Sequence, residues 1–109
     1  MTKKFHIALS VSDIPQSVAD YSRRLGYKPT LVIKNEYALW RTDSLNFSIR
    51  KTAEGAGTLR HVGWEDSQAQ KFDSEKDCNE ILWEHFSADH QAQEIRETWP
   101  DTKQDPDKS

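Results

Sequence analysis

The sequence predicts an α+β fold in which two related modules share one mixed β-sheet, the second module is truncated, and an extra helix follows at the C-terminal end. Residues 4–11 alternate apolar and polar side chains, and a capped helical segment and three short β-rich runs come after them. A second strand that carries a histidine, 59–65, begins like a repeat of the first, but no apolar-periodic helix follows it. The order of elements therefore indicates an internal repeat that is cut short.

The first module is expected over residues 1–51. It starts with a half-buried strand at 4–11, in which His6 shares the more polar face. Asp13 supplies an N-cap for the helix, and Gly26 is the residue type that ends one. The helix is expected at 14–25, and the three strands that follow at 30–33, 37–41 and 45–50.

The second module is expected over residues 58–86, after a flexible Gly-containing loop at 53–57. Its strands are predicted at 59–65 and 80–86, with a brief strand or a packed turn near Phe72.

The final helix is predicted over 88–98, with Ser87 as its cap, and residues 1–99 are expected to form a single domain. We expect this helix to cover the outer face of the second module, where four apolar side chains would otherwise be exposed: Val62, Trp64, Ile81 and Trp83. The alternatives are a loosely packed tail or a helix that contacts a partner. Residues 100–109 are expected to be a disordered tail.

The composition is typical of a soluble domain. The chain has 109 residues, of which 30% are charged and 35% hydrophobic, and its mean hydropathy is −0.89. A net charge of −3 and a pI near 5.8 argue against nucleic acid as a partner. The apolar runs are too short to cross a membrane, no secretory signal is expected, and the lone Cys78 fits a reducing compartment. We therefore expect a cytoplasmic protein.

Three side chains in three of the expected strands are candidates for a metal site: His6, His61 and Glu84. Two imidazoles and one carboxylate are the ligand set of a mononuclear catalytic site with open coordination positions. Strand alternation allows all three to face one side of the sheet, where a divalent ion would polarise a substrate oxygen or activate water. The competing interpretation is that each histidine is a hydrogen-bonded core or surface residue.

The other histidines, the cysteine and one further carboxylate are not expected to be metal ligands. His85 and His90 are expected to face solvent, and the cysteine is interpreted as incidental. Glu65 shares the face of His61, so it is either a base for catalysis or a surface carboxylate.

The candidate substrate-binding residues are Ser48, Arg50 and Trp40. Three arginines, Arg41, Arg50 and Arg60, could each meet an anionic substrate, and Arg50 is favoured because its strand parity matches that of Ser48.

Several short motifs together resemble the vicinal oxygen chelate superfamily in their order and spacing. They are a histidine in the first strand, a capped helix that ends Leu-Gly-Tyr, a later His-Val-Gly strand and a closing Asn-Glu-Ile-Leu-Trp-Glu strand. That family includes glyoxalase I, extradiol dioxygenases, fosfomycin-resistance thiol transferases and bleomycin-binding proteins. The resemblance covers residues 3–51 and, in fragments, 59–65 and 78–86. It implies paired βαβββ modules whose sheets curl into a funnel around a metal.

Carried over residue by residue, the resemblance assigns His6 to the first-strand ligand, His61 to the ligand that opens the second module and Glu84 to the carboxylate of the last strand. The implied ion is Fe, Mn, Zn or Ni. Glyoxalase I-like members place a further carboxylate on the last strand of the first module, but residues 45–50 hold none. The ligand set therefore resembles the dioxygenase and thiol-transferase branches more closely. Because members of the family often pair modules between chains, a homodimer is expected.

These observations predict a glyoxalase-like metal-dependent enzyme that acts on a small oxygen-chelating substrate, as a lyase, isomerase, thiol transferase or dioxygenase. One alternative is a metal-free small-molecule-binding protein of the bleomycin-resistance type, with a groove lined by Trp40, Trp64 and Trp83. Another is a degenerate domain kept for interaction, which the truncated second module favours.

Overall fold

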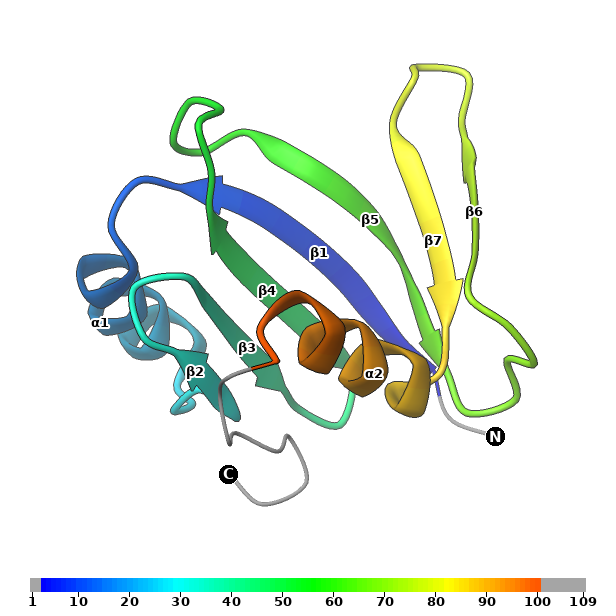
Figure 1. Cartoon of the computed structure of the whole chain (residues 1–109), viewed down its shortest axis with the longest axis horizontal. Coiled ribbons are helices and arrows are strands. Elements are labelled where there is room, and N and C mark those ends of the chain that lie inside the picture. Colours follow the sequence, from blue (N-terminus) through cyan, green and yellow to red (C-terminus); the bar gives the residue numbers. More distant parts are fainter. Residues whose placement is uncertain (1–2, 101–109) are drawn as a thin grey trace.

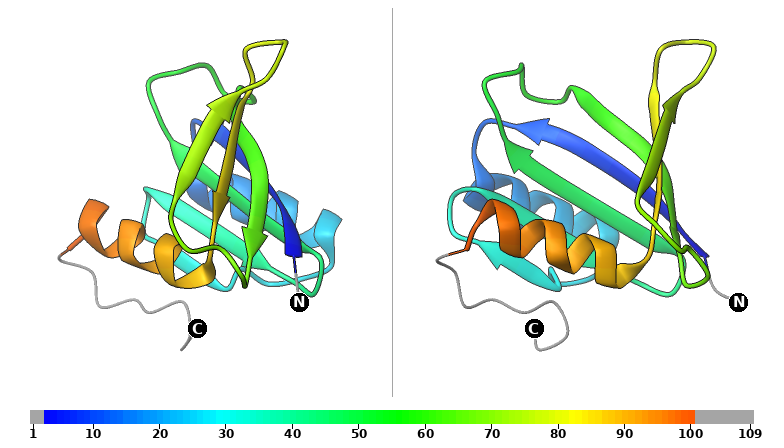
Figure 2. Two further views of the ribbon diagram at one scale, coloured as in Figure 1. Left: turned by 90° about the vertical axis from the view of Figure 1, so that its right-hand side faces the viewer. Right: turned by 45° about the vertical axis from the view of Figure 1, so that its right-hand side comes forward.

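Seven β-strands form one mixed sheet, and a helix lies against each of its faces (Figures 1 and 2). The computed structural model describes residues 3–100, which hold all of these elements. The strands are β1 (Lys3–Val11), β2 (Leu31–Ile33), β3 (Tyr37–Arg41), β4 (Leu45–Lys51), β5 (Leu59–Asp66), β6 (Asp73–Lys76) and β7 (Leu82–Phe86), and the helices are α1 (Ile14–Leu25) and α2 (Ala88–Thr98). The predicted α+β class and C-terminal helix are confirmed.

The sheet has the strand order β2-β3-β4-β1-β5-β7-β6, with β1 joining its two halves. β1 runs parallel to β4 and antiparallel to β5, and β7 runs parallel to β5 and antiparallel to β6. The sheet is not strongly curled, in contrast to the funnel that the resemblance implies (Figure 2). The reason is that β5 and β7 pair over four positions only, and residues 58–86 add neither a helix nor a further strand to extend the wall.

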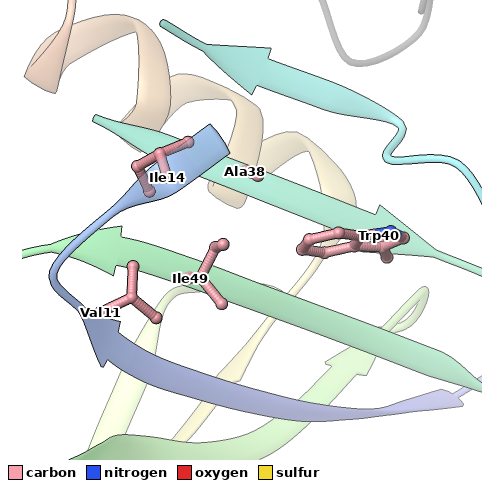
Figure 3. Packing of buried hydrophobic residues seen from close by; sticks show 5 residues of the cluster. All are labelled: Val11, Ile14, Ala38, Trp40 and Ile49. Carbon is pink, nitrogen blue, oxygen red and sulfur yellow. The ribbon is translucent and has the colours of Figure 1, made fainter. Parts of the chain in front are cut away.

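Helix α1 begins and ends at the residues that the sequence predicts. The Asp13 carboxylate accepts a hydrogen bond from the backbone N–H of Gln16, at 2.9 Å, and closes the first turn. Gly26 takes the left-handed conformation, with φ of 76°, and its N–H donates to the carbonyl of Ser22. The helix covers one face of the first half of the sheet over a buried cluster of Val11, Ile14, Ala38, Trp40 and Ile49 (Figure 3).

Helix α2 lies on the opposite face, so the expectation that it covers the outer face of the second module is wrong (Figure 1). Its buried Ile95 packs in a cluster with apolar side chains of β2 and β3, namely Leu31, Ile33, Tyr37 and Leu39. The ring of Trp99 lies 5.0 Å from that of Tyr37. These large side chains of the first module bury the narrow apolar face of the helix, which is why it docks there.

The apolar patch that the helix was expected to cover remains partly open. Trp64 is 39% exposed, and its ring packs edge-on against Phe5, with ring centroids 5.3 Å apart. Trp83 packs against the same Phe5 ring at 6.2 Å. This part of the outer face therefore relies on aromatic contacts within the sheet rather than on a covering helix.

The structure adjusts two expectations for the last two strands. The last strand begins at Leu82 rather than at residue 80, because the Asp77 carboxylate accepts the N–H groups of Asn79 and Ile81 and holds the preceding residues in a turn. The tentative strand near Phe72 is β6, four exposed residues paired with β7. The predicted tail at 100–109 lies, apart from Pro100, outside the described residues. Among the described helices, none has the length and apolar character that a membrane crossing needs.

Candidate metal centre

A single row of paired residues crosses the sheet and organises the site. The strand registers align Arg41 of β3, Asn46 of β4, His6 of β1, Gly63 of β5 and Glu84 of β7. Neighbouring strands lie about 4.8 Å apart, so residues two strands apart are about 10 Å apart at the backbone. Glycine is required at position 63 because a Cβ there would overlap the backbone of Glu84, so its absence lets β7 lie beside β5 at this point of the row.

The predicted ligands come together on the face of the sheet that α2 covers. Nε2 of His61 lies 3.1 Å from Oε1 of Glu84, and Nε2 of His6 lies 4.0 Å from the same oxygen. All three candidate ligand atoms fall within 4.8 Å of one another. Ligand atoms about 2.1 Å from a shared ion would stand roughly 3.0 to 3.6 Å apart, so small side-chain adjustments bring these groups to coordination distance. The donor set therefore fits a divalent ion with open positions.

Asn46 fixes the tautomer of His6. Its amide nitrogen donates to Oε1 of Glu65 at 2.8 Å, and because a carboxylate only accepts, the amide oxygen must be the atom that faces His6. Nδ1 of His6 lies 2.9 Å from this oxygen and 3.1 Å from the backbone carbonyl of Asn46, so Nδ1 carries the proton and donates. Nε2 is then left with its lone pair toward Glu84. An outer hydrogen bond of this kind is what orients a histidine that binds a metal.

A buried ion pair holds Asn46 in turn. Arg41 donates two hydrogen bonds to Glu65, each 2.9 Å long, and Gln91 of α2 exchanges hydrogen bonds with the Asn46 amide. Burial raises the pKa of Glu65, but the hydrogen bonds from Arg41 and Asn46 outweigh it and hold that pKa below its usual range. The carboxylate is therefore charged at neutral pH, as the orientation of Asn46 requires.

Burial disfavours the charged form of all three candidate ligands when no ion is bound. Burial lowers the pKa of His6, against the hydrogen bonds to Asn46, and burial with the nearby His6 and Arg60 lowers that of His61 to about 3. Burial and the charge of Glu94 raise the pKa of Glu84 to about 7. The pKa shifts of His61 and Glu84 run opposite to those that an ion pair between them would give, although Nε2 of His61 and Oε1 of Glu84 lie only 3.1 Å apart. A neutral imidazole presents a lone pair that can bind a metal, so both histidines are suited to act as ligands.

The ligands open into a small cavity of about 40 Å³ between the sheet and α2. Ser48 and Arg50 of β4 and Arg60 of β5 line its sheet side, and Glu94 and Trp99 line its helix side. Phe86, which is 1% exposed, closes the floor by packing edge-on against the His6 ring. Residues of helix α2 therefore form one wall of the cavity beside the candidate metal centre.

The other predicted residues lie elsewhere. The structure does not bring Trp40 to this cavity: it is fully buried under α1, and its indole N–H donates to the backbone carbonyl of Tyr27. Glu65 is neither a surface carboxylate nor a group that lines the cavity, because it is buried against Arg41. His85 lies on the outer face and contacts Asp66 at 2.8 Å.

Sequence reasoning missed the parts of the site that depend on long-range contacts. Asn46 received no role from the sequence, although it is two residues from Ser48 on the same expected strand and therefore shares its face. Gln91 and Glu94 reach the site only because α2 docks on this face of the sheet, whereas the helix was expected on the opposite face.

Comparison with known proteins found no family model that matches the chain and no curated protein that matches its sequence. The candidate site is therefore interpreted from its own geometry.

The raised pKa of Glu84 predicts how metal-free stability depends on pH. A pKa of about 7 in the folded chain, above the usual 4.5, means that folding favours the protonated group. This stabilisation is complete below the unfolded pKa and is lost as the pH rises through about 7. The glutamine in Glu84→Gln stays neutral at every pH. We therefore expect the free energy of unfolding of this variant, relative to that of wild type, to grow by about 2 kcal/mol between pH 5 and pH 8, measured by urea unfolding with a chelator present.

The matched control is Glu75→Gln, since Glu75 is exposed on β6. It should show no such growth. An advantage of Glu84→Gln that is equal at both pH values would contradict the prediction. With saturating metal at pH 8, wild type should become more stable than Glu84→Gln. An ion at about 100 times its Kd adds roughly 2.7 kcal/mol to the free energy of unfolding of wild type and nothing to that of the variant, which lacks a ligand.

Proposed function

We propose that the protein binds one divalent metal ion through His6, His61 and Glu84 and acts on a small molecule that chelates this ion through adjacent oxygens. The observation that carries the proposal is the convergence of these groups from β1, β5 and β7 beside a cavity, with the His6 tautomer fixed for binding. Three protein ligands leave coordination positions for a substrate, and a bound ion would polarise the substrate oxygens. Fe, Mn, Zn and Ni all suit this donor set.

We further infer that the two halves of the sheet are related βαβββ-type modules, the second truncated. In the first half β1 pairs in parallel with β4, which pairs with β3 in an antiparallel hairpin. In the second half β5 pairs in parallel with β7, which pairs with β6 in the same way. The equivalents of α1 and β2 would be the missing parts. This pairing supports the vicinal oxygen chelate resemblance, and with it a glyoxalase-like lyase, isomerase, thiol transferase or dioxygenase.

The test is metal stoichiometry. We expect the untagged wild-type chain, stripped with a chelator, to bind about one divalent ion, and His61→Ala to lose more affinity than the roughly 10- to 100-fold typical of an outer-shell change. His85→Ala is the matched control because His85 lies on the outer face, and it should bind like wild type. Wild type that binds no ion, or equal losses in the two variants, would contradict the proposal.

A second candidate function, metal-free binding of a small molecule, is favoured by a groove on the outer face. This groove has a volume of about 540 Å³, and Trp64 and Trp83 line it together with β6 residues such as Asp73 and Glu75. Aromatic faces and carboxylates together suit a cationic aromatic ligand. Ligand-induced changes in Trp fluorescence that persist with a chelator present would support this candidate. The expected homodimer stays a prediction, which sedimentation would test.

A further inference from the structure

A β-bulge turns Arg60 toward the candidate metal centre. Ala8 of β1 pairs with His61, but the next residue, Leu9, pairs with Leu59, so Arg60 is an extra residue on β5. Strict alternation would point Arg60 and His61 to opposite faces, yet both side chains line the same cavity. Bulges of this kind re-aim side chains beside functional sites.

Arg50 approaches the same cavity from β4. Its guanidinium lies over the ring of Trp99, with the central carbon 5.1 Å from the ring centroid. The ring attracts the charge of the guanidinium but takes up none of its strong hydrogen bonds, so the N–H groups can still donate to a ligand. Arg50 and Arg60 both lack a carboxylate partner at ion-pairing distance among residues 3–100.

The charges around the cavity leave room for an anion. Besides the two guanidinium groups, the charged side chains that line it are the carboxylates of Glu84 and Glu94, so the protein groups balance once both are ionised. A bound divalent ion would then leave the cavity with two uncompensated positive charges.

We propose that Arg50 and Arg60 form an anion clamp beside the metal, so that the substrate is a small dianionic oxygen chelator such as a dicarboxylate or a 2-oxo or 2-hydroxy acid that ionises on the metal. This inference rests on the proposed metal function and names its substrate class. Each carboxylate of a dicarboxylate, and the single chelating carboxylate of a 2-oxo or 2-hydroxy acid, gives one oxygen to the ion and offers the other to a guanidinium, which matches carboxylate geometry. The small cavity favours a ligand of few atoms unless α2 moves.

The experiment uses the Co²⁺-loaded full chain and follows its visible absorption while oxalate is added. Oxalate carries two adjacent carboxylates, and imidazole serves as a neutral ligand that binds a metal through one atom. We expect Arg60→Gln and Arg50→Gln each to weaken oxalate binding by about 10-fold or more and to leave imidazole binding unchanged. Arg60→Lys keeps the positive charge but lacks the paired N–H donors of a guanidinium, so it should lose less oxalate affinity than Arg60→Gln.

Arg23→Gln is the matched control, because Arg23 lies on the exposed surface of α1 and pairs with Asp20. It should bind both ligands like wild type. Co²⁺ affinity should be equal or tighter in Arg60→Gln, since the variant removes a positive charge beside the ion. The metal retained after desalting separates a ternary complex from extraction of the ion by oxalate.

The outcomes are distinguishable. Wild type that holds Co²⁺ but binds oxalate as weakly as the two glutamine variants overturns the clamp and leaves the metal function standing. Equal losses of affinity for oxalate and imidazole in the glutamine variants would have the same meaning, because they indicate a structural role for the arginines. Oxalate that only extracts the ion would likewise overturn the clamp alone. Wild type that holds no Co²⁺ overturns the proposed function and the clamp with it.

Discussion

Gly63→Ala is expected to remove metal binding and to lower the free energy of unfolding by about 3 to 5 kcal/mol. A Cβ at this position would overlap the backbone carbonyl oxygen of Glu84 and stand 2.7 Å from its backbone nitrogen. These atoms belong to the main chain of β7, so no side-chain rotation relieves the overlap. The strand must move away from β5, and Glu84 moves with it. Chemical unfolding and Co²⁺ titration would measure both losses.

Gly55→Ala is the matched control. Its added Cβ would meet only the Thr58 hydroxyl, at 3.7 Å, which is an ordinary contact. We expect this variant to keep wild-type metal affinity and stability, or to gain a few tenths of a kcal/mol from the stiffer unfolded chain. If Gly63→Ala does not fold, circular dichroism will record that as the larger loss. A folded Gly63→Ala variant with wild-type stability and metal affinity would show that β7 tolerates the Cβ.

The local parts of the fold were predictable because their signals lie in a few neighbouring residues. Asp13 and Gly26 cap α1 in the sequence and in the structure, and alternation alone put His6 on the face opposite Phe5 and Ile7. The three candidate ligands followed from the same parity, which the strand registers preserve.

Other features of the structure depend on long-range packing, which the alternation of side chains along a strand does not encode. The docking of α2 depends on Ile95 meeting side chains of β2 and β3 more than 50 residues earlier in the chain, and no local pattern encodes that choice. The bulge at Arg60 likewise arises from how β5 pairs with β1. Residue type alone could not place Trp40, because an aromatic side chain suits either a binding pocket or a hydrophobic core. In the structure Trp40 belongs to the core, where it packs under α1 and donates to the backbone carbonyl of Tyr27.

The row of paired residues that crosses the sheet also shows that the site depends on two residues that are not ligands, Gly63 and Asn46. β7 can lie beside β5 at Glu84 because Gly63 lacks a side chain, and His6 presents the lone pair of Nε2 because its Nδ1–H donates to the amide oxygen of Asn46. One residue provides space and the other provides orientation. Both act through the strand register, which fixes them relative to the ligands.

Asn46→Leu is expected to lower the free energy of unfolding by about 3 kcal/mol or more and to weaken metal binding by roughly 10- to 100-fold. Leucine has a similar volume but leaves His6, Glu65 and Gln91 without their hydrogen bonds to this side chain. Glu65 keeps Arg41, so the buried charge stays paired, whereas His6 loses the acceptor that fixes its tautomer.

Asn79→Leu is the matched control, because Asn79 is exposed in the turn before β7. Its stability should change by no more than about 0.5 kcal/mol, and its metal affinity should not change. The decisive readout is the NMR signal of the His6 ring in metal-free protein. In wild type it should show a single Nδ1-protonated tautomer, and in Asn46→Leu a mixture, since neither ring nitrogen then has a preferred side-chain acceptor. A single tautomer with unchanged metal affinity in Asn46→Leu would mean that the backbone carbonyl at position 46, 3.1 Å from Nδ1, is sufficient to orient the ligand.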